Sequence, residues 1–262
     1  MQSLIRFFVT ILVVLTCVPA PYYARGGEEG PPPARGDGAE RTDGLFRRLS
    51  NLEKEADSLR ASLARRGFTF SLCLRADGFL NTRGGLNTHD ARRFRWDVSF
   101  YGDLATGRAG WWEGGCFHFH VQHEQGEGPS AKDVGDFQGV SNMEAGDFTQ
   151  VSELWYRHTF LDGRAWIKAG KQDANADFAA PVYGGEFIHA SAGFSPTIPL
   201  PSFPDPDWGV SAGGRMGEAF SLVAGVYQGR PEGGHSLLET LRKFHGPMIL
   251  VEPGIHYRVR GL

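Results

Sequence analysis

The sequence predicts an all-β protein, an antiparallel transmembrane outer-membrane β-barrel with about eight strands present, on three observations. After residue 67, apolar and polar residues alternate with a period of two in eight separate runs, so each strand has one apolar and one polar face. Long and short connections alternate between these runs, as the external loops and periplasmic turns of outer-membrane barrels do. After the first 20 residues, no apolar run is long enough for a transmembrane helix.

The N-terminal residues carry export and linker patterns. In residues 1–24, Arg6 precedes a short apolar core, and Ala20 and Ala24 supply small residues near a cleavage point, which is typical of a signal peptide. Residues 25–43 are rich in Gly, Pro and charged groups and poor in apolar ones, which predicts a disordered linker. The chain is therefore expected to be exported.

Residues 44–66 predict an amphipathic helix that precedes the strands. Leucines and one alanine recur at spacings of four and three, which is a short heptad seam, and Gly67 follows as a helix end. The seam positions are Leu45, Leu49, Leu52, Ala56, Leu59 and Leu63. Two interpretations stay open: a coiled coil that assembles a homotrimer, or one helix docked on the protein.

The strand runs of residues 67–262 fix which side chains share a face. The eight runs fall near 68–77, 94–100, 117–122, 152–160, 165–169, 210–215, 220–226 and 249–259. In the fourth run, Ser152, Leu154 and Tyr156 are expected on the apolar face, opposite Glu153 and the other polar positions.

A tight turn at 162–163 sets the register between the fourth and fifth runs. An Asp-Gly turn there pairs Arg157 with Lys168 on the polar face. Directly opposed like charges are destabilising. A neighbouring carboxylate such as Glu153 is the expected compensation.

Charge and motif content exclude several functions. The 262-residue chain has a formal net charge of -3, so it has no basic excess for nucleic acid. His118, His120 and His123 lack a placed acidic third ligand, so solvated histidines are expected rather than a metal site. No nucleophile, phosphate-loop or paired acid–base motif is present, and no cofactor is predicted.

The two cysteines beyond the signal region are expected to be free thiols. Cys73 and Cys116 fall on the polar faces of the first and third strands, with one strand between them. Two strand spacings are about 9.6 Å, beyond the roughly 7 Å Cα separation that a disulfide tolerates.

An ordered series of segments resembles the bacterial carbohydrate-selective porins. The segments are 63–70 (LARRGFTF), 140–145 (VSNMEA), 153–156 (ELWY), 160–164 (FLDGR), 169–172 (AGKQ), 177–179 (DFA), 183–185 (YGG), 187–188 (FI), 209–210 (GV) and 225–229 (GVYQG). The resemblance implies a sixteen-stranded porin in the outer membrane that lets small sugars diffuse passively and has no enzymatic activity. With eight strands, this chain would supply half of such a barrel. Relatives tend to carry an acidic residue where Arg157 stands.

The candidate pore-lining residues combine aromatic faces with charged groups, because sugars present both C–H surfaces and hydroxyls. The polar strand face contributes Arg75, Asp97, Glu153, Trp155, Arg157, Trp166 and Lys168, and the third long loop contributes Asp177, Phe178, Tyr183, Glu186 and Phe187. For each aromatic residue, loop packing or membrane anchoring is the competing interpretation.

Two other functions remain as alternatives. A secreted β-sandwich that binds or cleaves carbohydrate would use Asp97, Glu153 or Glu186, but it would not explain the alternation of loop lengths. A barrel with a structural or adhesive role would not transport. The expected partners are small sugars, outer-membrane lipid and, through the helix, two further copies of the chain.

Overall fold

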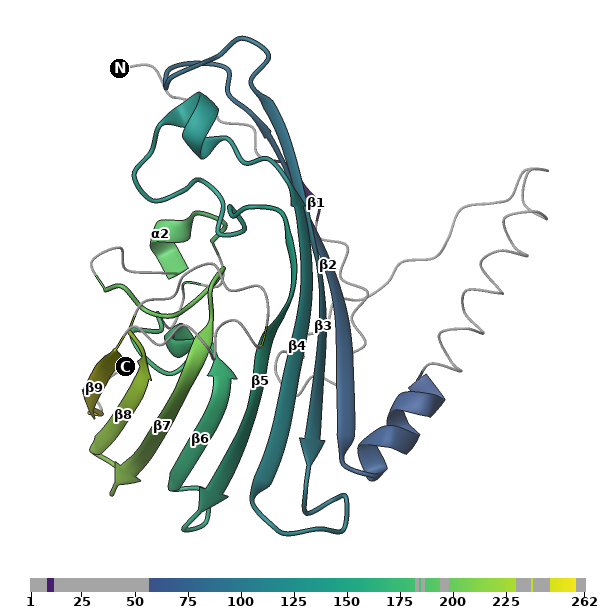
Figure 1. The fold of residues 1–262 in the computed structure, drawn as a ribbon, viewed down its shortest axis with the longest axis vertical. Coiled ribbons are helices and arrows are strands. Elements are labelled where there is room, and N and C mark those ends of the chain that lie inside the picture. Colours follow the sequence, from purple (N-terminus) through teal and green to yellow (C-terminus); the bar gives the residue numbers. More distant parts are fainter. Residues whose placement is uncertain are drawn as a thin grey trace, which may run out of the picture.

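The computed structural model describes residues 9–11, 57–181, 184, 187–193, 198–229, 237 and 246–257. All strands in this part of the chain form one antiparallel sheet, in which each strand pairs with its neighbours in sequence (Figure 1). The strands are β1 (Val9–Ile11), β2 (Phe68–Leu80), β3 (Arg92–Ala105), β4 (Gly115–Gly126), β5 (Phe148–Phe160), β6 (Ala165–Gln172), β7 (Asp207–Met216), β8 (Phe220–Gln228) and β9 (Pro247–Ile255). The eight predicted runs are β2 to β9, which confirms the all-β antiparallel prediction.

The sheet is open, because its strand order runs from β1 to β9 without a closing pair. The three-residue β1 pairs only with residues 76–78 of β2, and it lies within the segment predicted as an export signal. One continuous sheet is not a two-layered arrangement, so the sandwich alternative finds no support.

Long and short connections lie at opposite ends of the sheet, as predicted (Figure 1). The short turns are 106–114, 161–164 and 217–219, and they lie at the lower end in Figure 1. The long connections include loop 1 (81–91), loop 2 (127–147) and loop 3 (173–206). Loop 2 contains a one-turn π-helix, η1 (Ser130–Val134), and loop 3 contains η2 (Ala174–Ala176) and α2 (Ala190–Gly193).

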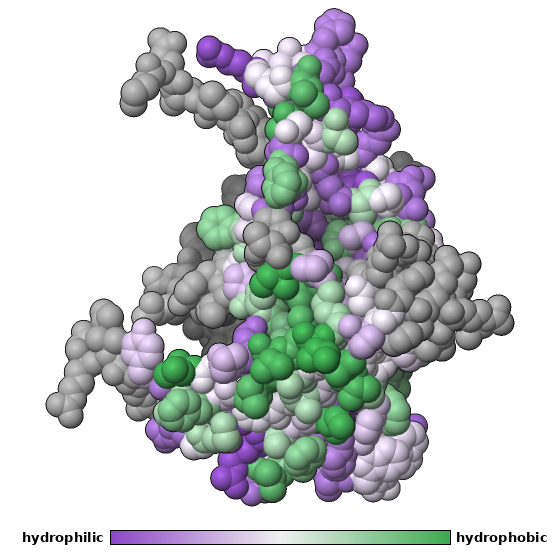
Figure 2. Space-filling model, turned by 60° about the vertical axis from the view of Figure 1, so that its left-hand side comes forward, coloured by the Kyte–Doolittle hydropathy of each residue, from purple (hydrophilic) through white to green (hydrophobic). Residues whose placement is uncertain are grey.

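Burial in this sheet is the reverse of that in a soluble protein. Polar side chains of the inner face are buried, and apolar side chains of the outer face are exposed. The exposed outer positions include Leu72, Phe94, Phe117, Leu154, Ile167, Val210, Leu222 and Val226, and the buried inner positions include Asp77, Asp97, Ser99, Gln122, Lys168 and Ser211. Figure 2 shows hydrophobic side chains gathered in the lower half of the molecule and hydrophilic ones at the long-loop end. An exposed apolar face of this extent fits contact with lipid.

A β-bulge in β5 corrects one predicted face. His120 of β4 pairs with Glu153, whereas the next residue, Val121, pairs with Val151, so Ser152 is the extra residue. Ser152 is buried, and its hydroxyl donates to the Gln122 side chain at 2.9 Å. The prediction that Ser152 lies on the apolar face is therefore wrong, because one inserted residue reverses the alternation of the strand at that point.

The turn between β5 and β6 has the predicted register. Arg157 pairs with Lys168 and Trp155 with Gly170. Asp162 and Gly163 both have positive φ, at 54° and 86°, which an Asp-Gly sequence tolerates.

Only the last part of the predicted helix 44–66 falls in the described residues, where 57–65 are helical. Gly67, with φ 87°, ends it before β2 begins. The Arg60 guanidinium lies 5.8 Å from the ring centroid of Phe70, on the outer face of β2. This contact favours the docked-helix interpretation. The remainder of the signal, the linker 25–43 and residues 44–56 lie outside the described residues.

Cys73 lies on β2 and Cys116 on β4, and β3 separates them, as predicted. Both thiols are free.

Candidate functional site

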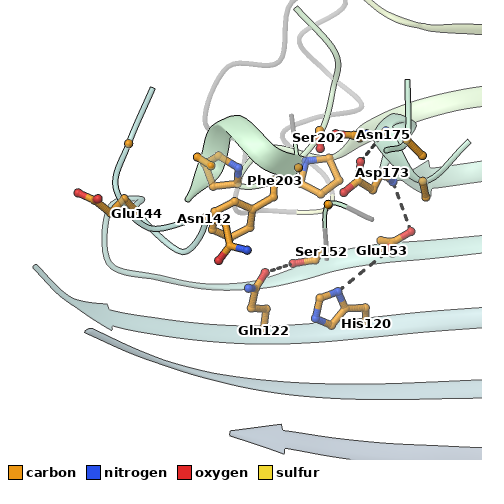
Figure 3. Close-up of a pocket in the computed structure, with 18 of the residues that line it drawn as sticks. His120, Gln122, Asn142, Glu144, Ser152, Glu153, Asp173, Asn175, Ser202 and Phe203 are labelled. Carbon is orange, nitrogen blue, oxygen red and sulfur yellow. Dashed lines mark hydrogen bonds and ion pairs between the residues drawn. The ribbon is translucent and has the colours of Figure 1, made fainter. Parts of the chain in front are cut away.

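A cavity of about 580 Å³ lies between the inner face of β2–β5 and loops 2 and 3. Its volume is in the range of about 300–1,000 Å³ that small-molecule sites occupy. Figure 3 shows strand residues below it and loop residues above it. Its lining includes Arg75, Tyr101, His120, Gln122, Asn142, Glu144, Ser152, Glu153, Asp173, Asn175, Ser202 and Phe203.

The strand side of the cavity is a connected polar network centred on Asp97. The Arg75 guanidinium donates two hydrogen bonds to Asp97 Oδ1, at 3.0 and 2.9 Å. The Gln122 side chain donates to Asp97 Oδ2 at 2.9 Å, and Ser99 donates to the same carboxylate. Asp97 is fully buried, so these donors compensate a charge that would otherwise be costly. Arg75 therefore reaches the cavity wall already paired.

Glu153 connects the strand side to loop 3. Its carboxylate accepts a hydrogen bond from Trp155 Nε1 at 2.9 Å and one from the backbone N–H of Asp173 at 3.3 Å. His120 Nδ1 lies 4.0 Å from the same carboxylate (Figure 3). Asp173 accepts from the Asn175 backbone N–H at 2.7 Å, and burial raises the pKa of its carboxyl to about 6.

Loop 2 forms another wall of the cavity and is held by two side-chain anchors, the buried Ser141 and the partly buried Glu144. Ser141 donates to Asp77 of β2 at 2.7 Å. The Glu144 carboxylate accepts hydrogen bonds from Ser130 and from the backbone N–H groups of Val140 and Ser141. These bonds fix the loop across the inner face of the sheet.

Loops 2 and 3 also contact each other. Asn142 N–H donates to the Ile188 carbonyl at 2.7 Å, and its side chain donates to the Phe187 carbonyl at 3.5 Å. The cavity is thus bounded by two loops that are bonded to the strands and to each other.

A second cluster of predicted residues lies closer to the short turn between β5 and β6. Arg157 stacks on the Trp166 ring at 4.4 Å. The Lys168 ammonium forms an ion pair with Asp177 of loop 3 and lies 5.4 Å from the Trp155 ring centroid. A neighbouring carboxylate does pair with one of the two facing cations, but it is Asp177 rather than Glu153, whose carboxylate bonds to Trp155 and Asp173. The Trp166 ring covers the other cation, Arg157.

Aromatic and imidazole rings stack in pairs on the inner face, near the cavity and near the Arg157–Lys168 cluster. Tyr101 and His120 stack with centroids 4.1 Å apart, and His118 and Trp155 stack at 4.6 Å. His118 Nδ1 also lies 2.8 Å from Asp103 Oδ1. Both imidazoles are thus largely shielded from solvent by neighbours on the sheet, so the expectation of solvated histidines is wrong for His118 and His120. In the part of the chain that the structure describes, no group of three or more His, Cys, Asp and Glu side chains is arranged to hold a metal ion.

The predicted residues of loop 3 have different positions. Phe178 is buried with Ala174, Leu200 and Tyr227. This burial favours the loop-packing interpretation for Phe178. Phe187 is exposed, at 59%, and does not line the cavity. Tyr183 and Glu186 lie outside the described residues.

Several lining residues were not among the predicted ones. His120 and Gln122 share the predicted polar face of β4, so the alternation could have identified them. Asn142 and Glu144 lie in the VSNMEA segment, where only the resemblance pointed to them. Ser152 was assigned to the wrong face, because the alternation of β5 does not show the bulge at this residue. Ser202 and Phe203 depend on the path of loop 3, which no period in the sequence encodes.

An open antiparallel sheet with an apolar outer face, a buried polar inner face and long loops folded over that face has the features of the porin class of membrane β-proteins. No helix among the described residues is long and apolar enough to cross a membrane.

Residues 88–259 match the family model described as carbohydrate-selective porin, OprB family. This match covers more than half of the chain, and the chain belongs to that family. The solved structure titled "High pH structure of Pseudomonas putida OprB" resembles the chain with a TM-score of 0.65 at 19% sequence identity, and the likeness shows the fold. It covers 78% of this chain and 51% of the other, so this chain spans about half the length of that porin. Among curated proteins the comparison found no match.

Proposed function

We propose that this chain is part of an outer-membrane porin through which small carbohydrates diffuse passively. The observation that carries the proposal is the cavity between the polar inner face and loops 2 and 3. Membership of the carbohydrate-selective family supports the solute class. The exposed apolar outer face supports the location in a membrane.

The lining suits neutral, hydroxyl-rich solutes better than ions. Its charged groups already have partners within the protein: Arg75 is paired with Asp97, Glu153 accepts from Trp155, and Glu144 accepts from loop 2. Hydroxyl-rich ligands exchange hydrogen bonds with such groups without leaving a buried charge unpaired. A weak and reversible site of this kind allows solute to enter and to leave.

The proposed solute path continues from the cavity toward the short turns along Trp155, Trp166, Arg157 and Lys168. The two indole rings lie along the inner face, where their surfaces can contact the C–H faces of a sugar, with the two cations stacked against them. Tyr183 and Glu186 remain proposed contributors from loop 3, and Phe187 is proposed as a weaker one, because its exposed ring lies outside the cavity. Phe178 is proposed to support the loop, because its ring is buried.

We further propose that β2–β9 form half of a sixteen-stranded barrel. The supporting observations are the open sheet and the likeness to about half of a solved porin chain. Assembly as a homotrimer through the N-terminal helix stays a proposal as well.

The proposal is tested by fractionation and by liposome swelling with the complete porin. We expect recovery in the outer membrane with heat-modifiable gel mobility, and faster swelling with small sugars than with size-matched neutral non-sugars. Recovery as a soluble periplasmic protein would overturn the location. Equal swelling rates for both solute classes would overturn the carbohydrate selectivity.

A further inference from the structure

Three exposed arginines gather at the short-turn end of the sheet. Arg65 is the last residue of the described helix, Arg66 follows it, and Gly67 joins them to β2. Gly67 is packed against the β3–β4 turn: its carbonyl accepts from Ala105 N–H at 2.8 Å, and a methyl group added at Gly67 would lie 3.1 Å from Arg108 Cβ. The end of the helix and the turn that carries Arg108 are therefore adjacent. We call Arg65, Arg66 and Arg108 the basic rim patch.

The basic rim patch borders the apolar outer face of the sheet. The described helix lies beside the lower end of β2 (Figure 1). Its Arg60 contacts Phe70, which packs against Phe100 with ring centroids 6.1 Å apart on the outer face. The patch thus lies where the apolar belt meets the level of the short turns.

Two tryptophans mark the same level. Trp111 and Trp112 belong to the β3–β4 turn, stack at 5.7 Å and are 58% and 47% exposed. Trp112 Nε1 donates to the Tyr156 hydroxyl at 2.7 Å, which fixes its ring. Amphipathic rings of this kind gather where hydrocarbon meets polar headgroups. The arginines therefore lie at headgroup depth rather than in bulk solvent.

The charge at this place is positive. The turn contributes one carboxylate near the three arginines, that of Glu113, which lies against Gly107. Asp57, on the helix, is already paired with Arg60 at 3.1 Å. Guanidinium groups bind phosphate oxygens in a bidentate geometry, and cations at a membrane surface attract anionic lipids.

We propose that the basic rim patch binds the headgroups of anionic glycerophospholipids in the leaflet that faces the short turns. The inference rests on the proposed membrane location, and it gives the helix 57–65 a role in holding the porin at a fixed depth. The patch takes phosphate-bearing lipid headgroups, with the two tryptophans covering the adjoining acyl–headgroup boundary.

The test uses the complete porin in nanodiscs that contain equal amounts of phosphatidylglycerol and phosphatidylcholine. Native mass spectrometry counts the lipids that stay bound after release from the disc. The variant R65Q/R66Q is compared with R83Q/R92Q, a matched pair of exposed arginines at the long-loop end. R65K/R66K keeps the charge and tests whether charge rather than helix packing is responsible.

We expect the wild-type porin and R83Q/R92Q to retain phosphatidylglycerol in preference to phosphatidylcholine. In R65Q/R66Q the ratio of bound phosphatidylglycerol to bound phosphatidylcholine should fall roughly tenfold. In R65K/R66K this ratio should stay close to the wild-type value. An unchanged preference in R65Q/R66Q would overturn the proposal. So would dissociation of an oligomer by R65Q/R66Q, because a second copy would then cover the patch. Sugar conductance of the same samples is recorded separately, so failure of the porin function is distinguishable from failure of the lipid site.

Discussion

Arg75 of β2 and Asp97 of β3 face each other across adjacent strands, and both guanidinium hydrogen bonds go to one oxygen of a fully buried carboxylate. Because Asp97 pairs with Arg75, the guanidinium at the cavity wall is not left without a counter-charge. It also holds Gln122, which in turn holds Ser152 of the bulge.

Replacing Asp97 by Asn should expose the Arg75 charge to the pore. Loss of a buried partner destabilises a protein by about 3 kcal/mol, and Arg75 would then attract anions. We expect a lower heat-modification temperature and a reversal potential in a KCl gradient that shifts toward chloride. Asp57→Asn, the same charge change on the exposed helix, is the control and should alter neither. An unchanged ion preference in Asp97→Asn would mean that Arg75 does not face the path.

Replacing Asp177 by Asn should release loop 3 from the strand face. Lys168 would lose its ion-pair partner while Arg157 stays opposite it, and the like charges would repel. Limited proteolysis should cut loop 3 faster than in wild type. Adding Arg157→Glu gives Lys168 a cross-strand partner and removes the repulsion, but it should not restore the protection, because loop 3 remains without its anchor. The same cleavage rate in wild type and Asp177→Asn would contradict the anchoring role.

Docking of loop 3 should depend on pH through Asp173. Burial raises the pKa of this carboxyl to about 6 in the folded protein, above its ordinary value. A raised pKa favours the protonated form, so the stabilising contribution is present at low pH and is lost as the pH rises through about 6. Protection factors for hydrogen exchange in loop 3, taken relative to the intrinsic exchange rate at each pH, should be higher at pH 5 than at pH 7.5. Asp173→Asn keeps an acceptor without the charge and should flatten this dependence. A pH dependence that persists in Asp173→Asn would assign it to another group.

Residues 25–262 alone should not give a stable sugar-conducting monomer. An open sheet leaves backbone groups unpaired along its edges, which lipid does not tolerate. A closed eight-stranded barrel has an interior that side chains fill, and this inner face carries Trp155, Trp166 and Arg157. Expression into the outer membrane should yield aggregation, degradation or pairing with a second half. A stable monomer with steady sugar-blocked conductance would refute the half-barrel proposal.

The strands and their pairing could be predicted because the alternation and the turn lengths are local properties. The pairing of Arg157 with Lys168 followed from one Asp-Gly turn. The bulge at Ser152 could not be predicted in this way, because it depends on how β5 pairs with β4 rather than on the sequence of β5 alone.

The site was predicted less completely than the sheet. The alternation predicts the inner face for strand residues such as Arg75 and Glu153, and both lie on that face beside the cavity. The ion pair between Lys168 and Asp177 and the burial of Phe178 depend on the path of loop 3 through space. A loop without a repeating pattern gives no signal for such long-range contacts.

We propose that small sugars pass through the cavity between the inner face of β2–β5 and loops 2 and 3. Single-channel recording of the complete porin with added sugar measures this passage. We predict that a small sugar reduces the current in a saturable manner, and that Trp155→Ala and Glu153→Gln weaken this block several-fold. Phe187→Ala, which changes an exposed residue outside the cavity, should have a smaller effect. A current that responds equally to sugars and to size-matched neutral non-sugars, in wild type, in Trp155→Ala and in Glu153→Gln, would contradict this path.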